Sequence, residues 1–247
     1  MSKLTSDAII LNTIDYSESD KIACTLTKDH GIISAIAKGA KRSKKRFPGT
    51  LEPFSEVTLI YSFQEGRDLM RIESANLKSA NLGIREDLNL LAHASVLTEV
   101  IIALLGPHDP SPEVYNYLRD ALSYMDKHKQ WFSVWSISMI NLLKALGYGI
   151  DLSAVLTAQA GMNPWHNISS NLKVNENQWP SLSPEALTFI KKGVGVEYSV
   201  LTRMIVSPQA RIEIERFLFM LSNRISGKPL KSVTFLAKLL DLSLEQW

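Results

Sequence analysis

The chain has 247 residues, 45% of them hydrophobic and 21% charged, and its 27 Lys and Arg against 25 Asp and Glu leave a formal net charge of +2. A chain of this length and composition can bury a sizeable core, which excludes an intrinsically disordered protein. The single cysteine, Cys24, excludes an intramolecular disulfide and a cysteine-based zinc site.

The first 77 residues are predicted to form β-structure. Ile22, Cys24 and Leu26 alternate with small or polar residues, the period of two that is typical of a half-buried strand. Gly31 and Gly66 suit turns, the second of them in a hairpin. The predicted strands span residues 6–14, 21–27, 32–37, 56–63 and 68–77. Five short strands in this length indicate a small barrel or sandwich, of which the OB-fold is the five-stranded form.

From about residue 82 the spacing of apolar residues becomes helical, and a first long helix is predicted over residues 86–105, ended by Gly106-Pro107. Ser-Pro pairs at residues 111, 183 and 207 predict three helix starts, because Ser caps an N-terminus and Pro fits the first turn. Residues 131–147 are apolar almost all round, which is typical of a helix buried inside a bundle. A last amphipathic helix is predicted from Pro229 to about residue 242.

Between residues 147 and 180, Gly, Pro and Asn residues replace the helical pattern and indicate irregular chain. We therefore expect an α+β protein with two domains. Residues 1–80 form a five-stranded OB-fold barrel that binds nucleic acid, and residues 81–247 form an α-helical domain with an irregular insertion at about 148–180.

The excess of positive charge lies in the first domain, where residues 1–80 hold 12 Lys and Arg against 10 Asp and Glu. It is concentrated in residues 38–46, here called the basic loop, because Gly39, Pro48 and Gly49 favour a loop there. The six cations of the basic loop are Lys38, Lys41, Arg42, Lys44, Lys45 and Arg46. Lys and Arg release condensed counterions when they contact phosphates, so the loop is suited to nucleic acid of any sequence. The alternative is a solvated surface without a partner.

Two further cations of the predicted hairpin, Arg67 and Arg71, extend this DNA-binding patch. Phe47, Phe54 and Tyr61 are aromatic residues of the kind on which bases stack, although each also suits a hydrophobic core.

Motifs for catalysis or cofactors are not found in the sequence. Gly193-Val-Gly195 lacks the third glycine of a dinucleotide turn, and there is no Walker-type Gly-Lys-Ser/Thr sequence. The five histidines have no partner at metal-ligand spacing, and the pairs Glu86–Asp87 and Glu213–Glu215 are interpreted as solvated helix faces. We therefore expect no enzyme, no catalytic residue, no cofactor and no metal. An enzyme with a site inside residues 147–180 is an alternative.

The opening seven residues lack the apolar core of a signal peptide, and the longest apolar run, residues 96–105, is interrupted by Glu99 and too short to span a bilayer. We expect a cytoplasmic protein with no membrane partner.

The first third of the chain also carries short motifs in a fixed order. They are Tyr16-Ser-Glu18-Ser-Asp20, Thr27-Lys-Asp-His-Gly31, Ala37-Lys38-Gly39-Ala40-Lys41-Arg42, Arg46-Phe47 and Leu51-Glu-Pro53-Phe54. This order resembles the N-terminal OB domain of the RecO family. Leu230-Lys231-Ser232, after a long predicted helix that ends at Gly227, resembles the C-terminal end of the same family.

The resemblance implies a recombination mediator in DNA repair, located in the cytoplasm at the bacterial nucleoid. Such a protein binds single- and double-stranded DNA, anneals complementary strands and, with RecR, helps to load RecA onto DNA coated by single-stranded-DNA-binding protein (SSB). The implied partners are DNA, RecR, the acidic C-terminal tail of SSB, and RecA indirectly. An OB-fold adaptor that binds RNA is the alternative function.

Many RecO proteins hold zinc with four cysteines after the helix that ends here at Gly147, but residues 151–171 contain no cysteine, so we expect none in this chain. An acidic tail that ends in an aromatic residue needs an apolar groove rimmed by cations. Four arginines of the helical domain are available for that rim: Arg203, Arg211, Arg216 and Arg224.

Overall fold

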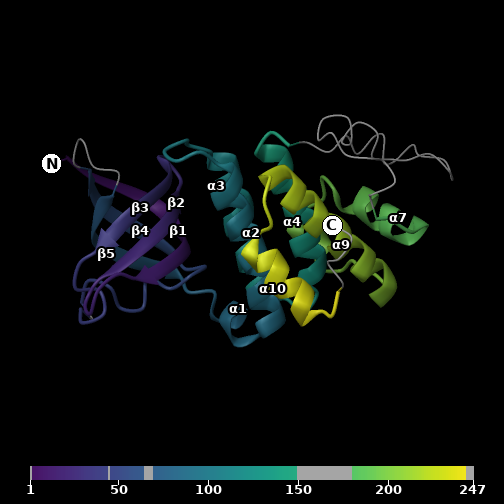
Figure 1. Ribbon diagram of the computed structural model, residues 1–247, viewed down its shortest axis with the longest axis horizontal. Helices are drawn as coiled ribbons and strands as arrows, with labels where there is room; N and C mark the ends of the chain where they lie inside the picture. The colour runs from purple at the N-terminus through teal and green to yellow at the C-terminus, as the bar shows by residue number, and fades with distance from the viewer. Residues whose placement is uncertain (1, 44, 64–68, 149–179, 243–247) are drawn as a thin grey trace.

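A computed structural model describes residues 2–43, 45–63, 69–148 and 180–242. A β-barrel forms one end of the molecule and a bundle of helices forms the other (Figure 1). The predicted hairpin turn at 64–67 and the predicted insertion, apart from its end residues, lie outside the described residues.

The barrel contains β1 (Ser2–Asp15), β2 (Lys21–Thr27), β3 (Gly31–Ala37), β4 (Glu56–Phe63) and β5 (Met70–Ser79). It closes in the order β1-β2-β3-β5-β4, and every neighbouring pair is antiparallel except β3 and β5. The predicted five-stranded OB-fold is therefore confirmed. β1 begins earlier than predicted, because its first half pairs with β4 and its second half with β2.

The middle of β1 buries both of its faces, one inside the barrel and one against the helices. In β1, Ala8 and Ile10 belong to the core inside the barrel. Ile9 and Leu11 point outward and belong to the same hydrophobic cluster as the helices. This alternation follows from the period of two in a strand, and it makes the barrel and the bundle share one continuous core.

The helices are α1 (Leu82–Glu86), α2 (Leu88–Leu104), α3 (Pro112–Lys127), α4 (Trp131–Ala145), α7 (Pro184–Gly193), α8 (Tyr198–Leu201), α9 (Pro208–Ser226) and α10 (Lys231–Leu239). The three predicted Ser-Pro starts are confirmed, since Ser111, Ser183 and Ser207 each accept a hydrogen bond from the N–H three residues on. α4 is buried around most of its circumference, as predicted.

Two of these cap residues are linked by hydrogen bonds, because each of them donates to a glutamate of the other's helix. Ser183 donates its N–H to Glu213 of α9 at 2.8 Å. Ser207 donates its N–H and its hydroxyl to Glu185 of α7, at 2.8 and 2.7 Å. The hydrogen bonds from Ser207 hold the pKa of Glu185 below its ordinary value. Each carboxylate thus lies at the positive end of the neighbouring helix, where negative charge is stabilising.

One carboxylate predicted to be solvated is buried. Glu215 is 1% exposed and lies beside His93 of α2, with 3.1 Å between Oε1 and Nε2. Arg211, one turn earlier on α9, donates to the same oxygen at 3.0 Å and stacks over Trp131. The prediction was wrong because it left out His93 of α2, whose imidazole, together with Arg211, gives the buried carboxylate its hydrogen-bond partners.

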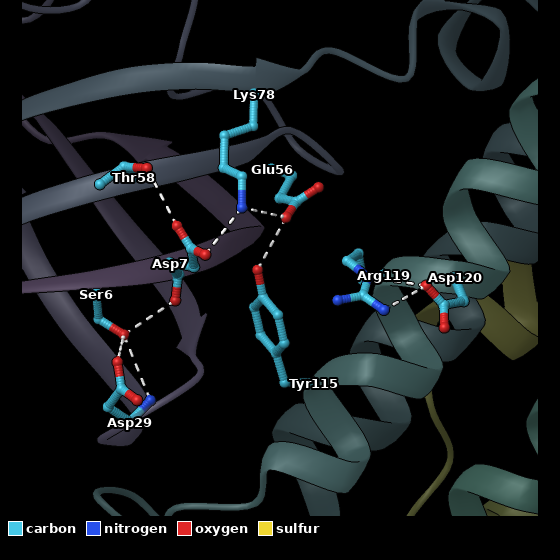
Figure 2. Close-up of polar contacts among 9 residues, drawn as sticks. All are labelled: Ser6, Asp7, Asp29, Glu56, Thr58, Lys78, Tyr115, Arg119 and Asp120. Atoms are coloured by element: carbon cyan, nitrogen blue, oxygen red, sulfur yellow. Dashed lines mark hydrogen bonds and ion pairs between the residues drawn. The ribbon is translucent and has the colours of Figure 1, made fainter.

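A polar cluster joins the barrel to α3 at the edge of the shared core (Figure 2). Lys78 of β5 bridges Asp7 of β1 at 2.8 Å and Glu56 of β4 at 3.1 Å. Tyr115 of α3 donates its hydroxyl to the same Glu56 oxygen at 3.1 Å. The hydrogen bond from Lys78 is the main cause that holds the pKa of Asp7 below its ordinary value.

Candidate nucleic-acid interface

The basic loop leaves the barrel at the end that faces away from the helices. β3 begins at Gly31, beside the connection between α2 and α3, where Ile32 forms a parallel bridge with Pro107. A strand rises about 3.3 Å per residue, so Ala37, at the far end of β3, lies roughly 20 Å from this junction. The loop that follows Ala37 is therefore placed clear of the helical bundle.

Main-chain hydrogen bonds attach the basic loop to the turn between β1 and β2. Gly39 donates its N–H to Asp20 at 2.8 Å, and Lys41 donates its N–H to the carbonyl of Ser19 at 3.0 Å. The ammonium of Lys41 lies 2.9 Å from the carboxylate of Asp15. The N–H of Gly39 is the main cause that holds the pKa of Asp20 below its ordinary value. These contacts give the first half of the loop a defined position.

The structure separates the predicted cations into exposed and engaged ones. Lys38 and Lys45 are exposed, and the side chain of Arg42 is 75% exposed, with a long contact of 3.9 Å to Glu18. Lys41 is engaged as described above. Arg46 is half-buried, donates to the carbonyl of Lys38 at 2.8 Å and lies over the ring of Phe47. The exposed cations can therefore contact phosphates without loss of the hydrogen bonds that hold the loop in place.

Of the remaining predicted cations, the structure describes Arg71. Arg71 lies on β5 beside the end of β3, since its register partner there is Ile36, and its side chain is 45% exposed near Glu73. It is thus close to the point where the basic loop begins. Lys44 and Arg67 lie outside the described residues.

The three aromatic residues considered for base stacking are core residues. Phe47 is 6% exposed, Phe54 is 3% exposed, and Tyr61 is fully buried with its hydroxyl 2.7 Å from His30. They cannot present a face to bases, so their suggested stacking role is wrong. The exposed aromatic beside the loop is Tyr16, at 62% exposure, in the turn between β1 and β2. Its polar neighbours in the sequence were the available signal that it lies outside the core.

A second feature is a groove of about 550 Å³ between the barrel, α2 and the start of α10. Leu11, Phe54, Leu91 and Ile102 supply apolar atoms to its lining, which also includes two cations, Lys228 and Lys231. The lining carboxylate, Glu99, is already occupied, because it accepts from the N–H groups of Lys231 and Ser232 at the start of α10. The groove therefore combines apolar walls with available positive charge.

Among the residues that the structure describes, no group of three or more His, Cys, Asp or Glu side chains could hold a metal ion. In the same part of the chain no helix has the length and apolar character needed to cross a membrane.

The chain is similar to known proteins over nearly all of its length. Residues 1–81 match the family model for the N terminus of recombination protein O, and residues 85–234 match the model for its C terminus. The DNA repair protein RecO of Syntrophotalea carbinolica is 29% identical over 98% of this chain and 96% of its own length. That of Bacillus pumilus is 27% identical over 94% and 93%. That of Myxococcus xanthus is 34% identical, and the match spans about half of each chain, 51% of both.

Proposed function

Because the chain belongs to the recombination protein O family of DNA repair proteins, we propose that it is a non-enzymatic recombination mediator. It binds single- and double-stranded DNA without sequence specificity and anneals complementary strands in the cytoplasm, at the nucleoid. With RecR it helps to load RecA onto single strands coated by SSB. Residues 1–80 serve as the DNA-binding domain and residues 81–247 as the domain for protein partners.

The observation that carries this proposal is the anchored basic loop with its exposed cations. Two single strands repel each other through their phosphates, and a cationic surface that contacts both lowers this repulsion. Contacts to phosphates leave the base edges free to pair, and they read no sequence. Annealing by this route forms and breaks no covalent bond and needs no nucleotide.

The test changes three exposed cations of the basic loop, Lys38, Arg42 and Lys45, together to Ala, and it leaves Lys41, which is ion-paired with Asp15, in place. Each phosphate contact contributes about 0.9 to the salt slope of duplex binding and about 0.7 to that of single-strand binding. The slopes should therefore fall by roughly 2–3 for both DNAs, measured by anisotropy of labelled oligonucleotides. A matched control removes three exposed lysines of the helical domain, Lys129, Lys144 and Lys238. Equal slopes for the two triple variants would exclude the loop as the DNA site.

Annealing is tested with complementary labelled strands mixed without ATP. The wild-type protein should accelerate pairing over the spontaneous rate, and the loop variant should lose most of that acceleration.

Titration with single-stranded DNA and RNA of one sequence separates the mediator from an RNA-binding adaptor. Clearly tighter binding of RNA would favour the adaptor.

The groove beside α10 is the place we propose for the acidic tail of SSB. Its apolar lining suits an aromatic side chain, and Lys228 and Lys231 suit the carboxylates. Of the arginines considered for such a rim, Arg211 is engaged by Glu215. Changing both groove lysines to Ala should weaken binding of a labelled tail peptide at least tenfold, whereas Lys238→Ala should leave it unchanged. Equal affinities would place the tail elsewhere.

A further inference from the structure

The first turn of α10 takes its cap from another helix. α3, α7 and α9 each begin at a serine that caps its own helix, whereas α10 has no side-chain cap at Leu230 and no acid in its first turn. Glu99 of α2, the helix beside α10 (Figure 1), takes this place. Its carboxylate accepts from the N–H of Lys231 at 3.0 Å, from the N–H of Ser232 at 2.7 Å and from the Ser232 hydroxyl.

This capped helix start lies in the wall of the groove beside α10. The N–H groups that begin a helix have no partner within it, and together with the helix dipole they favour a negative charge. Glu99 supplies that charge inside the groove, because Glu99, Lys231 and Ser232 all line it. Among the described residues of the lining, Glu99 is the one acid, and Lys228 and Lys231 are the cations.

The backbone that carries the two groove lysines is also held by contacts that do not involve Glu99. The hydroxyl of Ser226 donates to the carbonyl of Lys228 at 2.6 Å. Asn223 accepts from the N–H of Leu230 at 2.9 Å, and Leu230 is 1% exposed. The groove should therefore keep its shape when Glu99 loses its charge but keeps its length.

We propose that Glu99 limits the affinity of the groove for the acidic tail. Its charge cancels the positive start of α10 and repels the carboxylates of the ligand, so attraction is left to the ammonium groups of Lys228 and Lys231. This inference rests on the proposed function, which it extends from the place of the tail to the control of its release. A mediator that binds SSB on a coated strand has to leave it again, and a limited affinity allows this.

Two variants separate the charge of Glu99 from its role as a cap. Glu99→Gln removes the charge and keeps the length and one acceptor oxygen, whereas Glu99→Asp keeps the charge and shortens the side chain by one methylene. Glu197→Gln, at an exposed position outside the groove, is the control for net charge. Anisotropy measures the affinity for a labelled SSB tail peptide and for the same peptide with its acidic side chains changed to amides. Circular dichroism and thermal melting verify that each full-length variant is folded.

Glu99→Gln should bind the acidic peptide about three- to tenfold more tightly at low salt, because a repelling charge is removed from a part-buried site. The gain should shrink at high salt, which screens the repulsion. The amide peptide should show no gain, since it carries no charged side chain for Glu99 to repel. Glu99→Asp and Glu197→Gln should bind the acidic peptide no more tightly than wild type does.

Unchanged or weaker binding of the acidic peptide by Glu99→Gln overturns the inference, as does an equal gain for the amide peptide. Weaker binding by both Glu99 variants also overturns it and makes Glu99 a residue that only positions α10. Failure of the proposed tail site is distinguishable, because the variant that lacks Lys228 and Lys231 would then keep wild-type affinity. If only the role of Glu99 is wrong, that lysine variant loses affinity while Glu99→Gln gains none.

Discussion

Glu215→Ala should be strongly destabilising, although Glu215 lies far from the basic loop. The carboxylate is 1% exposed, and His93, its partner on α2, is fully buried between the rings of Trp131 and Trp135. Both ring nitrogens of His93 face oxygen atoms, Nδ1 at 2.7 Å from the carbonyl of Asn89 and Nε2 at 3.1 Å from Glu215. Removing Glu215 leaves one of these nitrogens without its partner in an apolar environment.

The magnitude follows from burial. A buried polar group that loses its hydrogen-bond partner costs about 1–3 kcal/mol, and a hydrogen bond to a charged group lies at the upper end of that range. The side chain of Arg211, which also contacts Glu215, is 34% exposed and can reach water, so the loss of this second contact adds little. We therefore expect the free energy of unfolding to fall by about 2–3 kcal/mol. With a urea m-value of about 2–3 kcal/mol/M, the midpoint of unfolding should move down by about 1 M.

Urea titration followed by circular dichroism measures this shift, with Glu86→Ala as the control at an exposed position. Replacing His93 and Glu215 together by Leu should cost less than Glu215→Ala, because apolar replacement of both partners leaves no buried group unpaired. A shift for Glu215→Ala no larger than that of the control would refute the reasoning, since the carboxylate would then be acting as a solvated residue.

Two further changes, Gly31→Ala and Lys78→Met, test the junction of barrel and helices, with Gly49→Ala as the control for the first. Gly31 and Gly49 both have a left-handed backbone, at φ +65° and +70°. An added Cβ at Gly31 would clash with the carbonyl oxygen of Asp109, whereas an added Cβ at Gly49 would face open space. Urea titration should therefore show Gly49→Ala to cost about 1–2 kcal/mol and Gly31→Ala at least ~2 kcal/mol more; equal costs would contradict the close approach. Lys78→Met should cost about 1 kcal/mol at neutral pH, because the ion pairs of Lys78 are part-exposed. Since the pair lowers the folded-state pKa of Asp7, the difference from wild type should be present above the ordinary value of 3.8 and vanish as pH falls through the lowered pKa, and a pH-independent difference would contradict this.

The elements that the sequence predicts well are those determined by nearby residues. A Ser-Pro pair specifies a helix start within one turn, and all three were found where expected. The alternation in β2 needs only seven residues, and its bounds agree with the prediction. α2 shows the limit of such patterns. Leu88 is 52% exposed, whereas Leu90 and Leu97 are buried, because apolar residues occur on several sides of this helix and their spacing does not reveal which side faces the core.

The site was harder to predict because its properties depend on contacts between distant segments. The sequence indicates six cations in the basic loop, but not that Lys41 is engaged by Asp15. The burial of Glu215 depends on His93, which lies 122 positions earlier in the chain.

The fold connects the groove proposed for the SSB tail to the basic loop through one strand. Asn12 of β1 lines the groove, and Asp15, three residues further, is ion-paired with Lys41 of the basic loop. Three residues of a strand span about 10 Å. Because the barrel shares its core with the bundle, the groove and the loop lie on one continuous structure. Under the proposed function, a tail bound in the groove would hold SSB beside the loop proposed to contact the released strand, which would give transfer of the strand a short path.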